Sequence, residues 1–146
     1  MVNGSFTSEA IGEFARDWYK KLDVHAPMVE LLPMLVAKDL FMIFPEATLT
    51  GLAAFESWYQ GVIRIFFDEV HNVQSVQSTI HGDEAEVKIV VRWEASRWNP
   101  PARNSDRIIT HAYQTWNVKK SSGSSKMVVT KYIVDKIEYL EGSAKL

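Results

Sequence analysis

The residue best suited to proton-transfer chemistry is His71. It stands near the start of a long extended segment, beside the acidic residues Asp68 and Glu69. A neutral imidazole takes up and releases protons near neutral pH, so His71 can serve as a general base toward a carbon acid or a water molecule. The alternative is a structural histidine whose ring is satisfied by a backbone carbonyl at a bend in the strand.

Two further residues are candidate catalytic groups. Asp39 precedes a short apolar segment, in which Leu40, Phe41 and Phe44 could supply the apolar surroundings that a catalytic carboxyl group needs. The alternative for Asp39 is a turn or capping role between a helix and a strand. Tyr19 carries a hydroxyl that could donate a hydrogen bond to a developing oxyanion.

Large apolar side chains along the expected helices and strands indicate a ligand pocket. An indole offers a wide flat wall and one N–H donor, which suits an aromatic or polycyclic ligand. The alternative for any one of these residues is a place in the core. We predict that the ligand-binding residues are Trp18, Leu22, Phe44, Trp58, Val62, Trp93, Trp116 and Tyr132.

The sequence does not suggest a metal or a cofactor. His71 and His81 are ten residues apart, and His25 and His111 lie elsewhere, which is not the spacing of a ligand cluster. The chain has no cysteine, so thiolate nucleophiles, disulfides and iron–sulfur clusters are excluded. Phosphate loops, dinucleotide-binding glycine patterns and nucleophile elbows are not present. We therefore expect a site without metal or cofactor.

Composition bounds the class of protein. The chain has 146 residues, of which 47% are apolar and 23% charged, as expected for one domain over residues 1–146. Its net charge of −2 leaves no basic stripe for nucleic acid. The N-terminus resembles no signal peptide, and no run of eighteen apolar residues could span a membrane. We expect a soluble, cytoplasmic protein without a membrane partner.

Four long strands are expected in the second half of the chain, at about 69–81, 84–98, 107–119 and 126–138. The second has apolar residues at every other position from Ala85 to Trp93, and Gly82-Asp83 supplies a turn before it. Ser121–Ser125 is expected to form a hairpin tip. If Trp116 points inward, alternation places His111 and Tyr113 on the outer face. A shorter strand is expected from Asp39 to Phe44.

Three helices are expected before these strands. The first follows a cap at Thr7 or Ser8 and buries the stripe Ile11, Phe14, Ala15, Trp18 and Leu22. The second begins at Pro27, and Pro33 should kink or shorten it. The third runs from Leu52 to about Phe67. The order predicts an α+β fold with the helices gathered on one side of an antiparallel sheet.

Several motifs in this order resemble the NTF2-like superfamily and, within it, the SnoaL-like group. They are Trp18-Tyr19 with Asp23-Val-His25-Ala-Pro27, Thr50-Gly51 before Ala54-Phe55-Glu56-Ser57-Trp58-Tyr59, Phe67-Asp68-Glu69-Val-His71, Gly82-Asp83-Glu84-Ala85, Gln114-Thr-Trp116 and Tyr132-Ile-Val-Asp135. The resemblance covers nearly the whole chain. It implies a cone-shaped α+β fold, with three N-terminal helices packed in a strongly curved antiparallel or mixed sheet around a deep pocket. It also implies a homodimer formed through the outer face of the sheet.

Two interpretations of function follow. In the first, the protein is a cofactor-independent isomerase, cyclase or hydratase that acts on an apolar or aromatic metabolite by proton transfer through His71 or Asp39. In the second, it is a non-catalytic ligand-binding or dimeric assembly domain. The superfamily that the chain resembles includes both kinds, so fold alone does not choose between them. We favour the enzyme, because a histidine beside acidic groups at a pocket mouth is unnecessary for enclosure alone.

Overall fold

The computed structural model describes residues 6–121 and 126–146 of the chain. The predicted hairpin tip at Ser121–Ser125 therefore lies, apart from its first residue, outside the described residues. In chain order the elements are α1 (Ser8–Asp23), α2 (Met28–Leu31), the 3-10 helix η1 (Leu32–Met34), β1 (Phe41–Phe44), β2 (Ala47–Thr50), α3 (Leu52–Ile65), β3 (Phe66–His81), β4 (Glu84–Arg97), β5 (Asp106–Lys120) and β6 (Met127–Tyr139).

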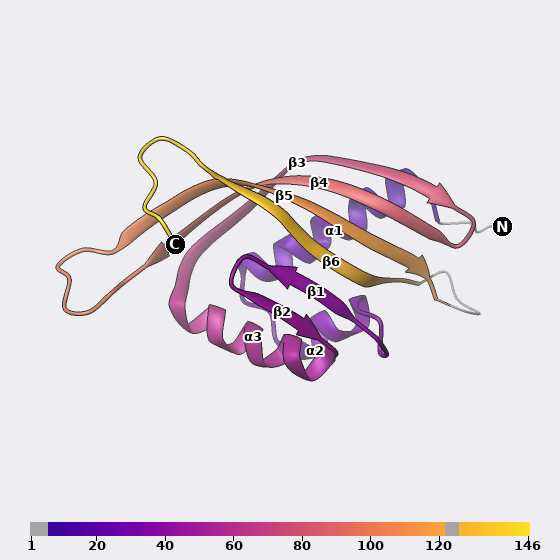
Figure 1. Cartoon of the computed structure of the whole chain (residues 1–146), viewed down its shortest axis with the longest axis horizontal. Coiled ribbons are helices and arrows are strands. Elements are labelled where there is room, and N and C mark those ends of the chain that lie inside the picture. Colours follow the sequence, from indigo (N-terminus) through magenta and orange to yellow (C-terminus); the bar gives the residue numbers. More distant parts are fainter. Residues whose placement is uncertain (1–5, 122–125) are drawn as a thin grey trace.

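The strands form one mixed sheet of six strands in the order β2-β1-β6-β5-β4-β3. β1 pairs with β6 in parallel, and all the other pairs are antiparallel. Helix α1 runs along the long strands and packs on β3, whereas α3 lies under the short β1–β2 hairpin (Figure 1). The α+β class, with three helices ahead of four long strands, is confirmed.

The helix boundaries follow local sequence signals. The Thr7 hydroxyl caps α1 by accepting the backbone N–H of Ala10 at 3.1 Å. Pro33 lies in η1, directly after the four residues of α2, so the second helix is shortened as predicted. The third helix ends at Ile65 rather than near Phe67, because the backbone of Phe66 is already extended.

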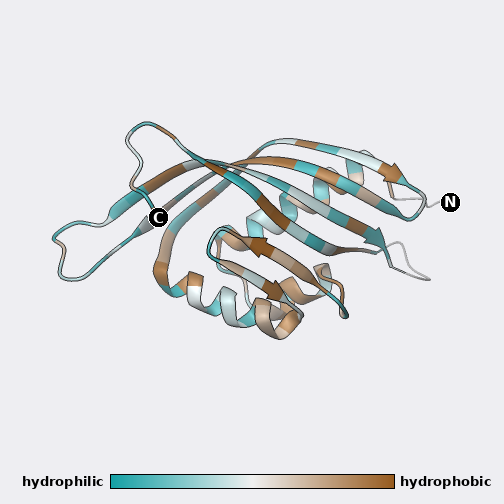
Figure 2. Ribbon diagram, in the orientation of Figure 1, coloured by the Kyte–Doolittle hydropathy of each residue, from teal (hydrophilic) through white to brown (hydrophobic). Residues whose placement is uncertain are grey.

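The core lies between the helices and the inner face of the sheet. Hydrophobic and hydrophilic residues alternate along the long strands (Figure 2), as expected when one face is buried. On β4 the residues Ala85, Val87, Ile89 and Val91 are all buried, which confirms the predicted alternation. Trp116 also points inward, and His111 and Tyr113 are only half-buried on the opposite side of β5.

A bulge near the start of β3 sets the orientation of the strand above the end of α3. The register with β4 shifts between Phe67 and Val70, and Asp68 in this gap has a left-handed backbone with φ 50°. The guanidinium of Arg107 donates to the carbonyl of Asp68 at 2.7 Å and so holds the bulge in place. After the bulge, Val70 faces outward, whereas its neighbours Glu69 and His71 face the interior.

No helix in the described part of the chain is long and apolar enough to cross a membrane.

Replacement of a core ring tests this packing. Phe55 is fully buried and contacts the rings of Trp18 and Tyr59, so Phe55→Ala should lower the free energy of unfolding by about 3–5 kcal/mol. Phe67 is 42% exposed, so Phe67→Ala should cost about 1 kcal/mol or less. Urea denaturation of the two variants measures both values. Equal losses would contradict the described core.

Candidate active site

A cavity of about 750 Å³ opens between α3, the end of α1 and the inner face of the sheet. This is within the usual size range of small-molecule sites. Its walls are largely apolar and aromatic. Eight of the predicted site residues line it, namely Tyr19, Leu22, Phe44, Trp58, Val62, His71, Trp93 and Tyr132.

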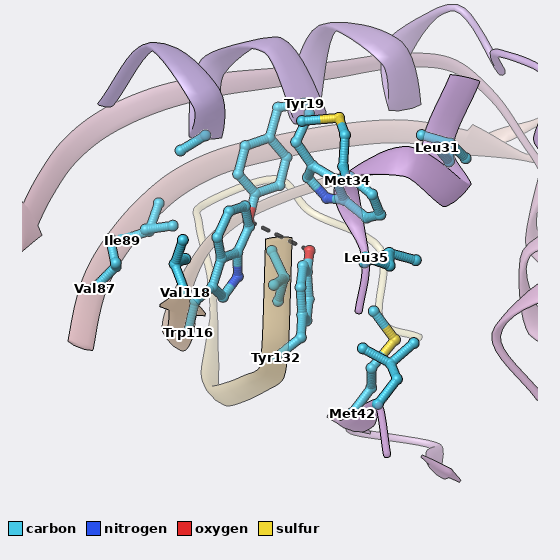
Figure 3. Packing of buried hydrophobic residues seen from close by; sticks show 14 of the residues in the cluster. Tyr19, Leu31, Met34, Leu35, Met42, Val87, Ile89, Trp116, Val118 and Tyr132 are labelled. Carbon is cyan, nitrogen blue, oxygen red and sulfur yellow. Dashed lines mark hydrogen bonds between the residues drawn. The ribbon is translucent and has the colours of Figure 1, made fainter. Parts of the chain in front are cut away.

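Trp18 and Trp116, also predicted to bind ligand, lie behind the cavity wall. Both are fully buried, and neither is among the lining residues. The ring of Trp116 stacks on that of Tyr132 at 5.0 Å and packs against Tyr19 at 5.8 Å (Figure 3). These two indoles therefore support the lining rings from the core.

Asp39 lies away from the cavity. It is one of the residues around a separate depression, with Lys38, Asp83 and Lys120, and it has a left-handed backbone with φ 65°. The structure thus does not bring Asp39 together with His71 or Tyr19. Its location at a tight turn before β1 agrees with the turn role that was the alternative for this residue.

His71 forms a pair with Asp23 at the end of α1. Its Nδ1 lies 2.7 Å from Oδ1 of Asp23, and the same oxygen accepts the backbone N–H of His71 at 2.8 Å. Because a carboxylate only accepts hydrogen bonds, Nδ1 carries the proton and Nε2 of the neutral ring is a free base. The ring of Tyr19 stacks on the imidazole at 5.2 Å and fixes its plane. The side chain of His71 is 11% exposed, and it lines the cavity.

A second carboxylate–imidazole pair lies in the same region. Nε2 of His25 is 2.6 Å from Oε2 of Glu69, whose other oxygen accepts the indole N–H of Trp93 at 3.0 Å. The hydroxyl of Tyr59 donates to the carbonyl of Ala26 at 2.6 Å and so anchors the turn that carries His25. His25 itself has a left-handed backbone, with φ 51°.

A buried polar network forms another part of the wall. The hydroxyl of Tyr19 donates to Oε1 of Gln114 at 2.7 Å, and the indole of Trp116 donates to the same oxygen at 3.4 Å. The hydroxyl of Tyr132 lies 3.4 Å from that of Tyr19 (Figure 3). Both donors use Oε1 of Gln114, which is a lining residue of the cavity and carries a second polar group, the amide Nε2.

Burial keeps the tyrosines of this region protonated. Burial and the neighbouring Tyr132 raise the pKa of Tyr19 well above its ordinary value. Burial also raises the pKa of Tyr132 to about 12, although its hydrogen bond with Tyr19 lowers it in part. At neutral pH both hydroxyls are therefore hydrogen-bond donors.

The partner of His71 lies far from it in the sequence. The carboxylate that binds it comes from Asp23, 48 residues earlier, rather than from Asp68 or Glu69 beside it. A usable signal was present, because the order carboxylate-Val-His occurs twice, at Asp23-Val-His25 and at Glu69-Val-His71. Gln114 carried no such signal, since its role depends on Tyr19 and on the side of β5 that it occupies.

Within residues 6–121 and 126–146, no three histidine or acidic side chains come together as a metal site.

The chain has the NTF2-like fold. The sequence matches no protein-family model and no curated protein. Among solved structures, a candidate aromatic ring hydroxylase from Novosphingobium aromaticivorans superimposes with a TM-score of 0.78 at 12% identity, over 95% of this chain and 96% of the other.

Two other solved structures carry the names of lyases. A candidate scytalone dehydratase from Novosphingobium aromaticivorans has a TM-score of 0.70 at 19% identity, over 94% of this chain and 88% of the other. A hexachlorocyclohexane dehydrochlorinase, LinA type 2, has a TM-score of 0.74 at 14% identity, over 94% and 91% of the two chains. Identities this low establish the shared fold alone.

Alkaline titration tests the burial of the tyrosine network. Burial and the charges of Glu69 and Glu30 raise the pKa of Tyr59 to about 12, the same value as for Tyr132. The unfolded chain therefore loses these protons first, so the free energy of unfolding is unaffected below pH 10 and falls as the pH rises toward 12. Tyrosinate absorbance should appear at higher pH in the native protein than in the protein unfolded in guanidinium chloride.

The variants Tyr59→Phe and Tyr132→Phe should each remove part of the absorbance change that the native protein shows near pH 12. Superimposable titration curves for the native and the denatured protein would contradict the buried network.

Proposed function

We propose that the protein is an enzyme that removes a proton from carbon in an apolar or aromatic small molecule and so promotes an elimination. The observation that carries this proposal is the orientation of His71. Asp23 binds Nδ1 of the ring at 2.7 Å, which leaves Nε2 as the basic atom of a side chain that lines the cavity. A positioned imidazole of this kind is a common general base in enzymes.

Each residue of the pair has a distinct task in this reaction. Nε2 of His71 takes the proton, the electron pair of the C–H bond forms a new double bond, and the leaving group departs with its own bonding pair. The imidazolium that results is stabilised by the carboxylate of Asp23, as in other histidine–carboxylate pairs. Tyr19 holds the plane of the ring, because the two rings stack.

The amide of Gln114 supplies a second requirement of proton removal. A proton next to a carbonyl group is removed more readily when the developing enolate oxygen receives hydrogen bonds. Nε2 of Gln114 is available for this purpose, since Tyr19 and Trp116 occupy its oxygen. In this account Tyr19 assists the oxyanion through Gln114 rather than by direct contact.

The apolar walls indicate the kind of substrate. The rings of Phe44 and Trp58 are stacked at 3.9 Å, and Trp93 lines the cavity near His71. Flat apolar walls with few polar groups favour a cyclic or aromatic ligand. The names of two structures with this fold, a dehydratase and a dehydrochlorinase, denote loss of water and of hydrogen chloride, and they support an elimination for this chain.

The activity of His71 can be tested with 5-nitrobenzisoxazole, an aromatic probe that opens when a base removes its C–H proton. The protein should accelerate this reaction, and His71→Ala should lower the rate by about 10²–10⁴-fold because the base is lost. Asp23→Asn should lower it by at least about tenfold, because the ring is no longer held in the required tautomer. Phenolate absorbance gives the rate.

The matched control is His111→Ala. The imidazole of His111 lies on the outer side of β5, 3.9 Å from Glu138, so its loss should leave the rate within about twofold. Equal effects of His71→Ala and His111→Ala would contradict the proposal. Binding of the probe without turnover at any pH would favour the ligand-binding interpretation instead.

A further inference from the structure

The two carboxylate-Val-His motifs form two crossed pairs. One motif, Asp23-Val-His25, lies at the end of α1, and the other, Glu69-Val-His71, begins in the bulge of β3. The carboxylate of the first binds the imidazole of the second, and the imidazole of the first binds the carboxylate of the second. The proposed elimination uses only the Asp23–His71 pair, so the pair of His25 and Glu69 has no task in it.

Glu69 is held at the cavity wall by two donors. Trp93 donates to Oε1 at 3.0 Å, and Nε2 of His25 lies 2.6 Å from Oε2. The side chain of Glu69 is only 10% exposed, yet it lines the cavity. Its influence is visible on Tyr59, because the charge of Glu69 is among the causes that raise the pKa of that hydroxyl. The carboxyl group is therefore fixed through both of its oxygens, on a residue of the cavity wall.

Glu69 and His71 lie on the same wall. Glu69 lies in the bulge of β3, His71 follows it by two residues, and both side chains line the cavity. Trp93 on β4 touches both, because its indole donates to Glu69 and its ring stacks on the imidazole of His71 at 6.2 Å. A ligand that contacts His71 therefore lies against the same wall as the carboxyl group of Glu69.

We propose that Glu69 is the general acid of the reaction and that the substrate is a β-hydroxy carbonyl compound with a cyclic or aromatic frame. The inference rests on the proposed function. Nε2 of His71 takes the α-proton, the C–H pair forms the C=C bond, and the C–O bond breaks as Glu69 passes to the departing oxygen a proton that it receives from the imidazolium of His25. The products are the unsaturated carbonyl compound and water.

His25 restores the proton that Glu69 gives up. Its Nε2 lies against the carboxylate, and its side chain is 27% exposed, so its imidazolium form can protonate Glu69 and then recover a proton from solvent. The proton that His71 has taken returns to solvent. Both pairs then regain their starting states. His25 does not line the cavity, so it is a positioning and relay residue rather than a catalytic one.

The need for an acid depends on the leaving group, which allows a direct test. Hydroxide is a poor leaving group whose departure is much faster when it is protonated as it leaves, whereas para-nitrophenolate leaves without help. The two probes are a β-hydroxy aryl ketone and the β-(para-nitrophenoxy) ketone of the same skeleton. Turnover of both is measured with the wild type, Glu69→Gln, His71→Ala and Glu138→Gln. The last replaces the outer carboxylate beside His111 and is the matched control.

Glu69→Gln should lower the turnover rate of the hydroxy ketone by about 10²-fold or more and that of the nitrophenoxy ketone by less than about threefold. His71→Ala should slow both, and Glu138→Gln neither. Equal losses for the two ketones in Glu69→Gln, or no loss for the hydroxy ketone, would overturn the acid assignment. Turnover of the nitrophenoxy ketone alone by the wild type would also overturn it. Failure of the wild type on both ketones would instead contradict the proposed function.

A second variant addresses the relay and guards against misfolding of the first. Asparagine tolerates the left-handed backbone of residue 25, so His25→Asn should fold. This variant should lower the turnover rate of the hydroxy ketone by about tenfold or more. Added imidazole should restore part of that rate, because the side chain of residue 25 is partly exposed to solvent. Slowing of both ketones without rescue would indicate a structural role for His25 and would overturn the relay.

Discussion

The contact between the end of α1 and the start of β3 determines the site. Asp23 is the last residue of α1, and its carboxylate takes both the backbone N–H and the ring Nδ1 of His71. This double contact fixes the strand relative to the helix and the ring relative to the strand. One partner in these hydrogen bonds is a carboxylate, and both side chains are largely shielded from solvent. The hydrogen bonds are therefore stronger than ordinary ones at the protein surface. This contact leaves Nε2 of His71 as the basic atom of the cavity wall.

The backbone on each side of the contact adopts conformations that L-residues rarely choose. His25 after α1 and Asp68 before Glu69 both have left-handed φ values, near 50°. Such residues cost of the order of 1 kcal/mol each and persist where surrounding contacts fix them. Tyr59 secures the first turn through Ala26, and Arg107 secures the second through the carbonyl of Asp68. Without the bulge, alternation would direct Glu69 and His71 away from the cavity.

The fold could be predicted from sequence because it depends on periodicity. The alternation from Ala85 to Trp93 predicted β4, the apolar stripe predicted α1, and Pro33 predicted that the second helix is short. Because Trp116 points inward, strand alternation also placed His111 on the outer face of β5. Within the site, His71 and most lining residues were predicted. Asp23 and His25 were not, because their roles arise from pairing across 48 and 44 residues. Asp39 lies away from the cavity, and a carboxylate before an apolar strand is equally typical of a turn.

The most direct test is the tautomeric state of the four histidines, measured from their side-chain ¹⁵N shifts by NMR in the free protein. The crossed pairs predict opposite neutral forms, with the proton of His71 on Nδ1 and that of His25 on Nε2, because each of these nitrogens faces a carboxylate. Asp23→Asn should abolish the preference at His71 alone. A proton on Nε2 of His71, or a rapidly averaging ring at either position, would contradict the account.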